Sequence, residues 1–354
     1  MSMAGLAESF AIEERHVGSG APCYVIAEAG ANHNKDLEVA YELIDVAADA
    51  GVDAVKFQVY SGRSLYSSRA PAFSYLQDGS GRSTQQHLED AALPREWLHS
   101  LVDRCASRGV ACLATPFDAS AVEELVEAGV PALKIASFEL VDLTLIAQAA
   151  APGKPLIISC GMARYGEIED ALQAVREAGG REVALLRCAS LYPAPAAIMN
   201  LRGMSTMRAA FGVPVGLSDH SEGIAVATGA AALGMQLLEK HFTLDRSMRG
   251  PDHAFAIEPQ ELCDLVHAIR AVEASLGSGR LEGPSEHEAA EMYTLARRSV
   301  VAASDIPAGT VVRREQLTVK RPGYGVSPKH LELLVGRTAL VDIADDEVIT
   351  WEML

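Results

Sequence analysis

Short apolar runs alternate with longer segments of helical periodicity over the first 276 residues. Each run is rich in Val, Ile and Leu, and the segment after it repeats apolar positions every three or four residues, which predicts a parallel strand followed by a helix. The eight runs are CYVIAEAG (23–30), DAVKFQVY (53–60), ACLATPF (111–117), ALKIAS (132–137), PLIISCG (155–161), VALLRCAS (183–190), VPVGLSDH (213–220) and QLLEKHF (236–242). Eight such units predict an α/β protein with a closed (β/α)8 TIM barrel.

Two segments depart from this alternation. Residues 61–92, after the second strand, are polar, contain Gly and Ser, and are too long for a simple connection, so we interpret them as a candidate active-site loop. The segment FAIEERHVG before the first strand alternates like a strand, and we expect it to form a hairpin that closes the floor of the barrel.

We assign residues 1–276 to the barrel. After them, the alternation of strand and helix patterns ends and the composition of the sequence changes. Residues 277–296 are rich in Gly, Ser, Pro and charge, and this composition is typical of a linker. Residues 297–354 carry short β-type runs broken by turn motifs such as PAG and RPGYG. We therefore predict a second, small β-rich domain there, which is small enough that it should dock on another surface.

Charge and composition argue against some partners and locations of the protein. The formal net charge is −17, which would repel nucleic acid and anionic membranes, so we expect neither as a partner. The N-terminus has no basic, apolar secretory signal, and no apolar run is long enough to span a bilayer, which predicts a cytoplasmic protein. The six cysteines are scattered without a CxxC pair, so we expect free thiols.

Polar residues gather at the carboxyl ends of the predicted strands, where the active site of such a barrel lies. Any one of them could be a hydrogen-bonded interior residue, and the shared location is what favours a functional site. These residues are Glu28, Asn32, His33, Lys56, Gln58, Thr115, Lys134, Ser137, Glu139, Ser159, Ser190, Tyr192, Ser218, Asp219, His220, Glu239, Lys240 and His241.

His220 and His241 end the seventh and eighth strands, which are neighbours in a barrel, so their imidazoles could converge on one divalent ion. Water, a substrate oxygen and a carboxylate such as Glu28 or Asp252 would complete the ligands of an ion of the Mn²⁺ type, which would act as a Lewis acid. The alternative is that both histidines are hydrogen-bonded core residues.

Lys56 and Lys134 stand in otherwise apolar strands. Burying the charge of a lysine at a barrel mouth costs free energy unless the ammonium group binds an anion such as phosphate or carboxylate. The alternative is that one lysine forms a Schiff base, which predicts activity without metal. Arg321, in the turn of VKRPGYG, is by itself typical of a solvated turn residue.

Ten ordered motifs resemble the sialic acid synthases, in particular the N-acetylneuraminate, legionaminate and pseudaminate synthases. They are AEAGANHN (27–34), DAVKFQ (53–58), TPFD (115–118), KIASFEL (134–140), IISCGMA (157–163), CASLYPAP (188–195), GLSDHSEGI (216–224), EKHFTLDR (239–246), GPDHAF (250–255) and KRPGYGVSP (320–328). The resemblance implies that the small domain is an antifreeze-like SAF domain of the β-clip type, which caps the barrel of a second subunit in a domain-swapped homodimer.

The resemblance also implies a reaction, in which phosphoenolpyruvate condenses with an N-acyl amino sugar to give a nonulosonic acid and phosphate. It makes His220 and His241 the ligands of Mn²⁺, with Mg²⁺ or Co²⁺ as alternatives, and Glu28 the acid/base residue. Phosphoenolpyruvate would be held by Lys56, Thr115, Lys134, Ser137, Ser159, Ser190 and Ser218. The acceptor sugar would meet Gln58, Glu139, Tyr192, Asp252 and, from the partner's cap, Arg321, which reverses the interpretation of that arginine from its turn alone.

Because the sequence departs from the family pattern at several positions, it does not identify the acceptor sugar. Cys160 and Ala189 stand where threonine is usual, and Leu191 lies in the segment that faces the acceptor. Residues 134–142 resemble pseudaminate synthases, whereas 241–253 resemble neuraminate and legionaminate synthases. Two other classes stay open at this point: a Schiff-base aldolase of the same sugar acids, and a non-catalytic sugar-binding protein.

Overall fold

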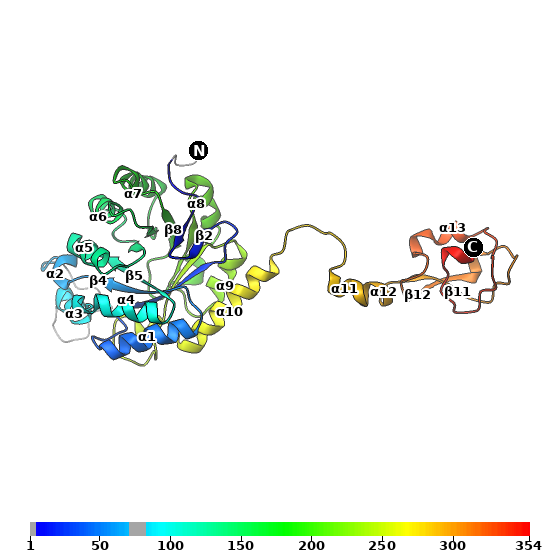
Figure 1. The fold of residues 1–354 in the computed structure, drawn as a ribbon, viewed down its shortest axis with the longest axis horizontal. Coiled ribbons are helices and arrows are strands. Elements are labelled where there is room, and N and C mark those ends of the chain that lie inside the picture. Colours follow the sequence, from blue (N-terminus) through cyan, green and yellow to red (C-terminus); the bar gives the residue numbers. More distant parts are fainter. Residues whose placement is uncertain (1–4, 71–82) are drawn as a thin grey trace. The chain divides into compact units, whose positions relative to one another are not determined.

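The structure, a computed structural model, describes residues 5–70 and 83–354. The chain divides into two compact units, Met1–Gly277 and Ser278–Leu354, each with a hydrophobic core of its own (Figure 1). All six cysteines are free, as predicted. In the part of the chain that the structure describes, we find no helix whose length and apolar character would suit it to crossing a membrane.

Parallel strands close on themselves in the first unit, and this confirms the predicted barrel. Among the described residues eight strands follow one another in chain order around the ring, and the last pairs with the first. They are β3 (Tyr24–Gly30), β4 (Ala54–Val59), β5 (Ala111–Pro116), β6 (Leu133–Ile135), β7 (Leu156–Ser159), β8 (Val183–Cys188), β9 (Val215–Asp219) and β10 (Leu237–His241). Each lies within one of the predicted runs, and β6 is the shortest.

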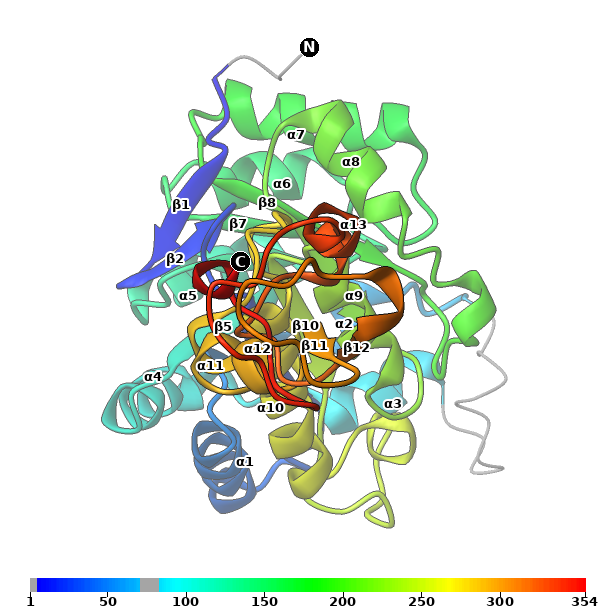
Figure 2. The same ribbon diagram turned by 90° about the vertical axis from the view of Figure 1, so that its right-hand side faces the viewer.

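Helices surround the strands, as Figure 2 shows for the ring that includes α1, α4, α6, α7 and α8. Side-chain caps begin several of them: Asp36 accepts from the backbone N–H of Glu38 at the start of α1, and Asp118 from that of Ala121 at the start of α5. The barrel helices are α1 (Leu37–Asp49), α4 (Leu98–Ser107), α5 (Ala119–Glu127), α6 (Leu143–Ala150), α7 (Tyr165–Glu177), α8 (Gly203–Phe211), α9 (Ala225–Ala232) and α10 (Pro259–Ser275). Shorter elements in this unit are α2 (Gly62–Leu65), α3 (Thr84–Ala91), η2 (Arg95–Trp97), η3 (Ala196–Ile198) and η4 (His253–Phe255).

An antiparallel hairpin closes the floor of the barrel, as the sequence predicted. It is formed by β1 (Ser9–Ile12) and β2 (Arg15–Gly18). Its apolar residues Phe10, Ile12 and Val17 are buried in one cluster with residues of the barrel strands such as Tyr24 and Leu237. Substrates therefore have to approach from the opposite end, where the strands finish.

The second unit is small and is built from short pairings. Its elements are α11 (Glu286–Ala290), α12 (Met292–Leu295), β11 (Ser299–Ala302), η5 (Arg314–Gln316), β12 (Leu317–Lys320), η6 (Pro328–His330), α13 (Leu331–Leu334) and η7 (Trp351–Met353). β11 and β12 pair antiparallel, and isolated bridges such as Val311 to Thr338 connect other predicted β-type runs. The segment predicted as a linker contains two short helices, because Ser285 and Glu288 form a capping box that begins α11.

Gly216 of β9 allows a close approach of β10 and gives a test of barrel packing. A Cβ at this position would lie 2.1 Å from the carbonyl oxygen of Leu237, a backbone atom that cannot turn aside. We expect Gly216→Ala to lower the free energy of unfolding by about 1–3 kcal/mol, through overpacking. Thermal unfolding followed by circular dichroism measures this. Gly166→Ala in α7, where a Cβ would meet no atom within 4 Å, is the control and should lose no stability; equal melting temperatures for the two variants would contradict the packing argument.

Candidate active site at the mouth of the barrel

The carboxyl ends of the strands surround a polar pocket. It is lined by Glu28, Lys56, Gln58, Thr115, Phe117, Lys134, Ala136, Ser137, Phe138, Ser159, Cys188, Tyr192, Ser218, His220, Glu239 and His241. Of the fifteen residues to which the resemblance gives a role, eleven lie in this lining, because alternate residues of each strand point toward the barrel axis. Ser190, Glu139 and Asp252 lie outside the lining, and Arg321 belongs to the second unit.

Buried lysines and glutamates compensate one another at the base of the pocket. Lys56 Nζ lies 2.6 Å from Glu28 Oε2 and 3.8 Å from Glu239 Oε2, and Lys134 Nζ lies 3.7 Å from the same Glu239 oxygen. Further hydrogen bonds run from Lys56 Nζ to Thr115 Oγ1 (3.0 Å) and from Gln58 Nε2 to Glu28 Oε1 (2.7 Å). The base of the pocket therefore combines cations that can bind an anion with carboxylates that can exchange protons.

Burial and pairing shift the pKa values of these groups in different directions. Burial opposes the charge on Lys56, but Glu239 and Glu28 outweigh it and raise the pKa of this lysine. For Lys134 burial dominates and lowers the pKa, although Glu239 partly offsets it. Burial raises the pKa of Glu28 in spite of Lys56, so this carboxyl can hold a proton more readily than an exposed glutamate.

Hydroxyl groups line the pocket together with the two lysines. Ser137 Oγ accepts from the backbone N–H of Gly161 at 3.0 Å, and Ser218 Oγ donates to Glu239 Oε1 at 3.3 Å. Ser159 Oγ is buried and has no hydrogen-bond partner among the described residues, so it is available to a ligand. Gly161 leaves the space for this arrangement, because a Cβ there would lie 2.1 Å from Ser190 Oγ.

The two predicted histidines face each other across the pocket, with ring centroids 5.5 Å apart. His220 Nδ1 lies 3.0 Å from the carbonyl oxygen of Ala189, so in the tautomer that donates to this oxygen the lone pair of Nε2 is left for the pocket. His241 Nδ1 is buried without a hydrogen-bond partner among the described residues. Aromatic side chains pack on both rings: the centroid of Tyr192 lies 4.2 Å from that of His220, and the centroid of Phe255 lies 5.1 Å from that of His241.

The protonation of the histidines follows their surroundings. Burial lowers the pKa of His241 well below its usual value, with further lowering by the charges of His220 and Lys56. Burial acts in the same direction on His220, but Cys188, whose Sγ lies 3.8 Å from Nδ1, outweighs it and raises the pKa. A bound cation would compete with a proton for His220 and favour the neutral ring.

The donor atoms of this pocket fit a divalent ion whose ligands come only partly from the protein. The described residues contain no group of three or more His, Cys, Asp and Glu arranged to hold a metal. The unpartnered His241 Nδ1 and the Nε2 of His220 offer two imidazole nitrogens in one pocket, donors of the kind that Mn²⁺ or a similar ion takes. Water and substrate would have to supply the other ligands.

Asp252 and Glu139 lie just behind the lining. Asp252 Oδ2 accepts from the backbone N–H of Ala31 at 3.2 Å and lies 4.0 Å from His241 Nδ1. Glu139 follows β6, and burial raises its pKa to about 7, against an opposing effect of Lys134. Both carboxylates are therefore near the mouth but are not brought into the pocket with the other predicted residues.

Glu239 and Cys188 line the pocket although no role was assigned to them from the sequence. Glu239 stands two residues before His241, and strand alternation places such residues on the same face, so the spacing already carried this signal. Phe117 and Phe138 also line the pocket, but they lie in loops where no periodicity predicts the direction of a side chain.

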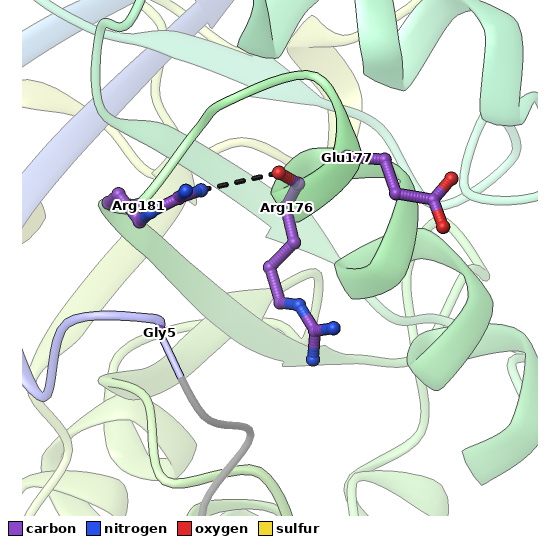
Figure 3. Close-up of a pocket in the computed structure, with 4 residues that line it drawn as sticks. All are labelled: Gly5, Arg176, Glu177 and Arg181. Atoms are coloured by element: carbon purple, nitrogen blue, oxygen red, sulfur yellow. Dashed lines mark hydrogen bonds between the residues drawn. The ribbon is translucent and has the colours of Figure 1, made fainter.

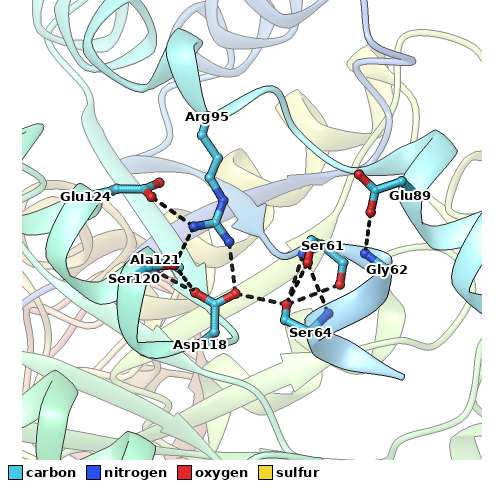
Figure 4. Close-up of polar contacts among 9 residues, drawn as sticks. All are labelled: Ser61, Gly62, Ser64, Glu89, Arg95, Asp118, Ser120, Ala121 and Glu124. Atoms are coloured by element: carbon cyan, nitrogen blue, oxygen red, sulfur yellow. Dashed lines mark hydrogen bonds and ion pairs between the residues drawn. The ribbon is translucent and has the colours of Figure 1, made fainter. Parts of the chain in front are cut away.

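Polar contacts anchor the base of the 61–92 insertion beside the mouth (Figure 4). Arg95 bridges Asp118 and Glu124, and Asp118 also accepts from Ser64 Oγ of α2 at 2.9 Å. The backbone N–H of Gly62 donates to Glu89 of α3. Residues 71–82 of the predicted loop lie outside the described residues. The ends of the insertion are thus fixed next to Phe117, which lines the pocket.

A second hollow lies away from the mouth and is lined by Gly5, Arg176, Glu177 and Arg181 (Figure 3). Arg181 donates to the carbonyl oxygen of Arg176. The hollow is an open surface feature without the mixed donor set of the mouth, so we assign it no chemistry.

Comparison with known proteins gives consistent matches over both units. The profile of the NeuB family matches residues 43–281, and that of the SAF domain matches residues 297–354. The N,N'-diacetyllegionaminic acid synthase of Campylobacter jejuni is 38% identical over 92% of this chain and 98% of that protein. The pseudaminic acid synthase of Campylobacter jejuni is 34% identical over 90% of this chain and 93% of that protein. A crystal structure of an N-acetylneuraminic acid (sialic acid) synthetase from Leptospira borgpetersenii matches with a TM-score of 0.71 and 33% identity, over 82% of this chain and 96% of that one.

The raised pKa of Glu139 predicts a pH dependence of stability. Below the pKa of the unfolded state, the carboxyl is protonated in both states; as the pH rises toward about 7, the unfolded state loses its proton first and stability falls. Glu139→Gln removes this loss, which amounts to roughly 3 kcal/mol. Between pH 5 and pH 8 the melting temperature of the wild type should therefore fall more than that of the variant. The exposed Glu123→Gln controls for the loss of one charge and should follow the wild type.

Proposed function

Since the chain belongs to the NeuB family of sialic acid synthases and carries a C-terminal SAF domain, we propose that it condenses phosphoenolpyruvate with an N-acyl amino sugar. The products would be a nonulosonic acid and phosphate. The observation that carries this proposal is one pocket in which two buried lysines and a row of hydroxyls adjoin a facing pair of imidazoles. An anion and a polarised carbonyl could be held there side by side.

Phosphoenolpyruvate would occupy the side of the pocket formed by Lys56 and Lys134. Its phosphate and carboxylate would be bound by these ammonium groups and by the hydroxyls of Thr115, Ser137, Ser159, Ser190 and Ser218. The lysines are already neutralised by Glu28 and Glu239, so binding a multiply charged anion favours protonation of one carboxylate.

A divalent ion, Mn²⁺ or alternatively Mg²⁺ or Co²⁺, held by His220 and His241 would supply Lewis-acid polarisation of the open-chain sugar aldehyde. C3 of phosphoenolpyruvate would then form a bond to C1 of the sugar, while the C=O π electrons pass to the aldehyde oxygen, which takes up a proton, and an oxocarbenium ion is left at C2 of the former phosphoenolpyruvate. Glu28, held by Lys56 and Gln58, would orient a water molecule toward C2 and accept its proton. Cleavage of the C2–O bond would expel phosphate and leave a 2-keto acid.

The acceptor sugar would lie on the side of Gln58 and Tyr192, with Asp252 and Glu139 close behind. The loops after β6, β7 and β8 expose apolar side chains on this face, including Phe138, Met162 and Leu191. We propose that the SAF domain of a second subunit covers this rim in a domain-swapped homodimer and brings Arg321 to the N-acyl group. Support comes from the separate cores of the two units, which allow an exchange that breaks neither.

One observation favours a second candidate, a Schiff-base aldolase. Burial lowers the pKa of Lys134, and a lysine nucleophile has to be neutral. Such an enzyme would need no metal, would release no phosphate, and would form a lysine adduct that borohydride traps.

The test is to incubate the protein with Mn²⁺, phosphoenolpyruvate and a panel of N-acyl hexosamines that includes 6-deoxy-diacetamido and 6-phosphorylated forms. We expect one sugar to give a nonulosonic acid by mass spectrometry, with one phosphate released per product. An ¹⁸O label in the C–O–P bridge should appear in that phosphate. Chelation should abolish turnover. Lack of phosphate release with every sugar would overturn the synthase proposal, and chelator-resistant activity with borohydride trapping would favour the aldolase.

His241→Ala is the matching variant for the proposed metal site, and we expect at least a thousandfold loss of turnover with retained circular dichroism. The exposed His267→Ala of α10 is its control and should keep wild-type activity. Full activity of His241→Ala would remove this histidine from the mechanism.

Arg321 tests the proposed cap. A charge-assisted hydrogen bond to the N-acyl oxygen contributes about 1.5–3 kcal/mol, so Arg321→Ala should raise the KM for the acceptor roughly tenfold or more. The KM for phosphoenolpyruvate should change little. Arg313→Ala, an exposed arginine of the same domain, is the control. Steady-state kinetics with each substrate varied in turn measures the difference, and an unchanged acceptor KM would exclude the cap from the site.

A further inference from the structure

Asp219 and Lys240 form a buried ion pair directly beside the two proposed metal ligands. Asp219 precedes His220 at the end of β9, and Lys240 precedes His241 at the end of β10. The two residues are register partners in the barrel, and their side chains are 0% and 2% exposed. The sequence placed both among the strand-end residues of the site, but neither lines the pocket, because strand alternation turns them away from it while their neighbours Ser218, His220, Glu239 and His241 line it.

The ion pair also fixes the backbone that leaves β9. Lys240 Nζ lies 2.9 Å from Asp219 Oδ2 and donates to the carbonyl oxygen of Ser221 at 2.5 Å. Asp219 Oδ1 accepts from the backbone N–H and the hydroxyl of Ser221, at 2.9 and 2.7 Å. The turn that contains His220 is therefore closed by Asp219 and joined to β10 by Lys240.

Other contacts hold His220 from its far side. Its carbonyl oxygen accepts from the backbone N–H of Ala194 at 2.8 Å, and its ring contacts the carbonyl oxygen of Ala189. Because Asp219 and Lys240 fix the turn, the imidazole of His220 can move little relative to β10. Its position relative to His241 is therefore also fixed.

Stability alone is a weak reason for such a pair. Removing two charges from water costs about as much as their attraction returns, and apolar residues of similar volume often replace a buried ion pair without loss. Burial indeed lowers the pKa of Lys240, although Asp219 opposes this. A role in positioning the histidines explains better than stability why the ion pair joins the two residues that directly precede His220 and His241.

We infer that the Asp219–Lys240 pair is a positioning device that sets the separation of the two imidazoles and so prepares them to bind a divalent ion. This inference rests on the proposed function. Neither residue lines the pocket, so both act through His220 and His241.

The experiment measures Mn²⁺ binding to the full chain by isothermal titration calorimetry after removal of metal with a chelator. The double variant Asp219→Asn/Lys240→Met removes both charges while keeping the side-chain volumes and an acceptor for Ser221. We expect its melting temperature to stay within a few degrees of the wild type, whereas the Kd for Mn²⁺ rises about tenfold or more, the range for groups that orient metal ligands.

The control is a second ion pair remote from the mouth. Asp53 and Arg270 lie 3.3 Å apart, and Asp53 accepts from the backbone N–H of Val25 near the start of β3. Asp53→Asn/Arg270→Met should change the melting temperature without changing the Kd for Mn²⁺. Ser221→Ala, which removes one hydroxyl contact and leaves the ion pair, should raise that Kd roughly threefold and serves if the double variant does not fold.

The outcomes separate this inference from the function on which it rests. If the wild type binds Mn²⁺ and the folded double variant, or Ser221→Ala in its place, binds it equally well, the positioning role is wrong while the metal proposal stands. If the wild type does not bind Mn²⁺, the metal proposal fails and the inference fails with it.

Discussion

Compensation of buried charge at the barrel mouth is the constraint on which the site depends. Lys56 and Lys134 are almost completely buried, and an isolated ammonium group there would lose its proton or destabilise the fold. Glu28 and Glu239 provide the opposite charge from β3 and β10, which pair with each other where the barrel closes. The ring of strands must therefore close in this register for the charges to meet, and the same register turns the imidazoles toward them.

The floor of the barrel is packed with apolar residues, whereas its mouth carries the polar groups of the site. At the floor, apolar residues of the strands and of the β1–β2 hairpin form a buried cluster. At the mouth, glycines keep space open: Gly30, with φ of +52°, has Asp252 Oδ2 2.5 Å from where a Cβ would stand. A side chain at Gly30 would push that carboxylate away from His241. Polar groups can therefore be unpartnered at the mouth because the floor and the helices supply the packing.

Backbone contacts explain why two departures from the family pattern are tolerated. Ala189 replaces the usual threonine, but His220 is held by the carbonyl oxygen of residue 189, which any side chain leaves in place. Cys160, also in place of threonine, is buried and makes a weak contact from Sγ to the carbonyl oxygen of Ile158 at 3.6 Å. Both changes lower the polarity around the lysine side of the pocket and leave the polar groups of its lining unchanged.

The barrel, the small second domain and most of the pocket could be predicted from the sequence, because strand periodicity fixes which residues share a face and parallel strands bring their carboxyl ends together. His220, His241, Lys56 and Lys134 could be selected for that reason. Only the tertiary structure showed that Glu239 pairs with both lysines, that Lys240 binds Asp219, and that His241 Nδ1 has no hydrogen-bond partner among the described residues. Such facts depend on distances across neighbouring strands, and these are set by how the whole ring closes rather than by any local pattern.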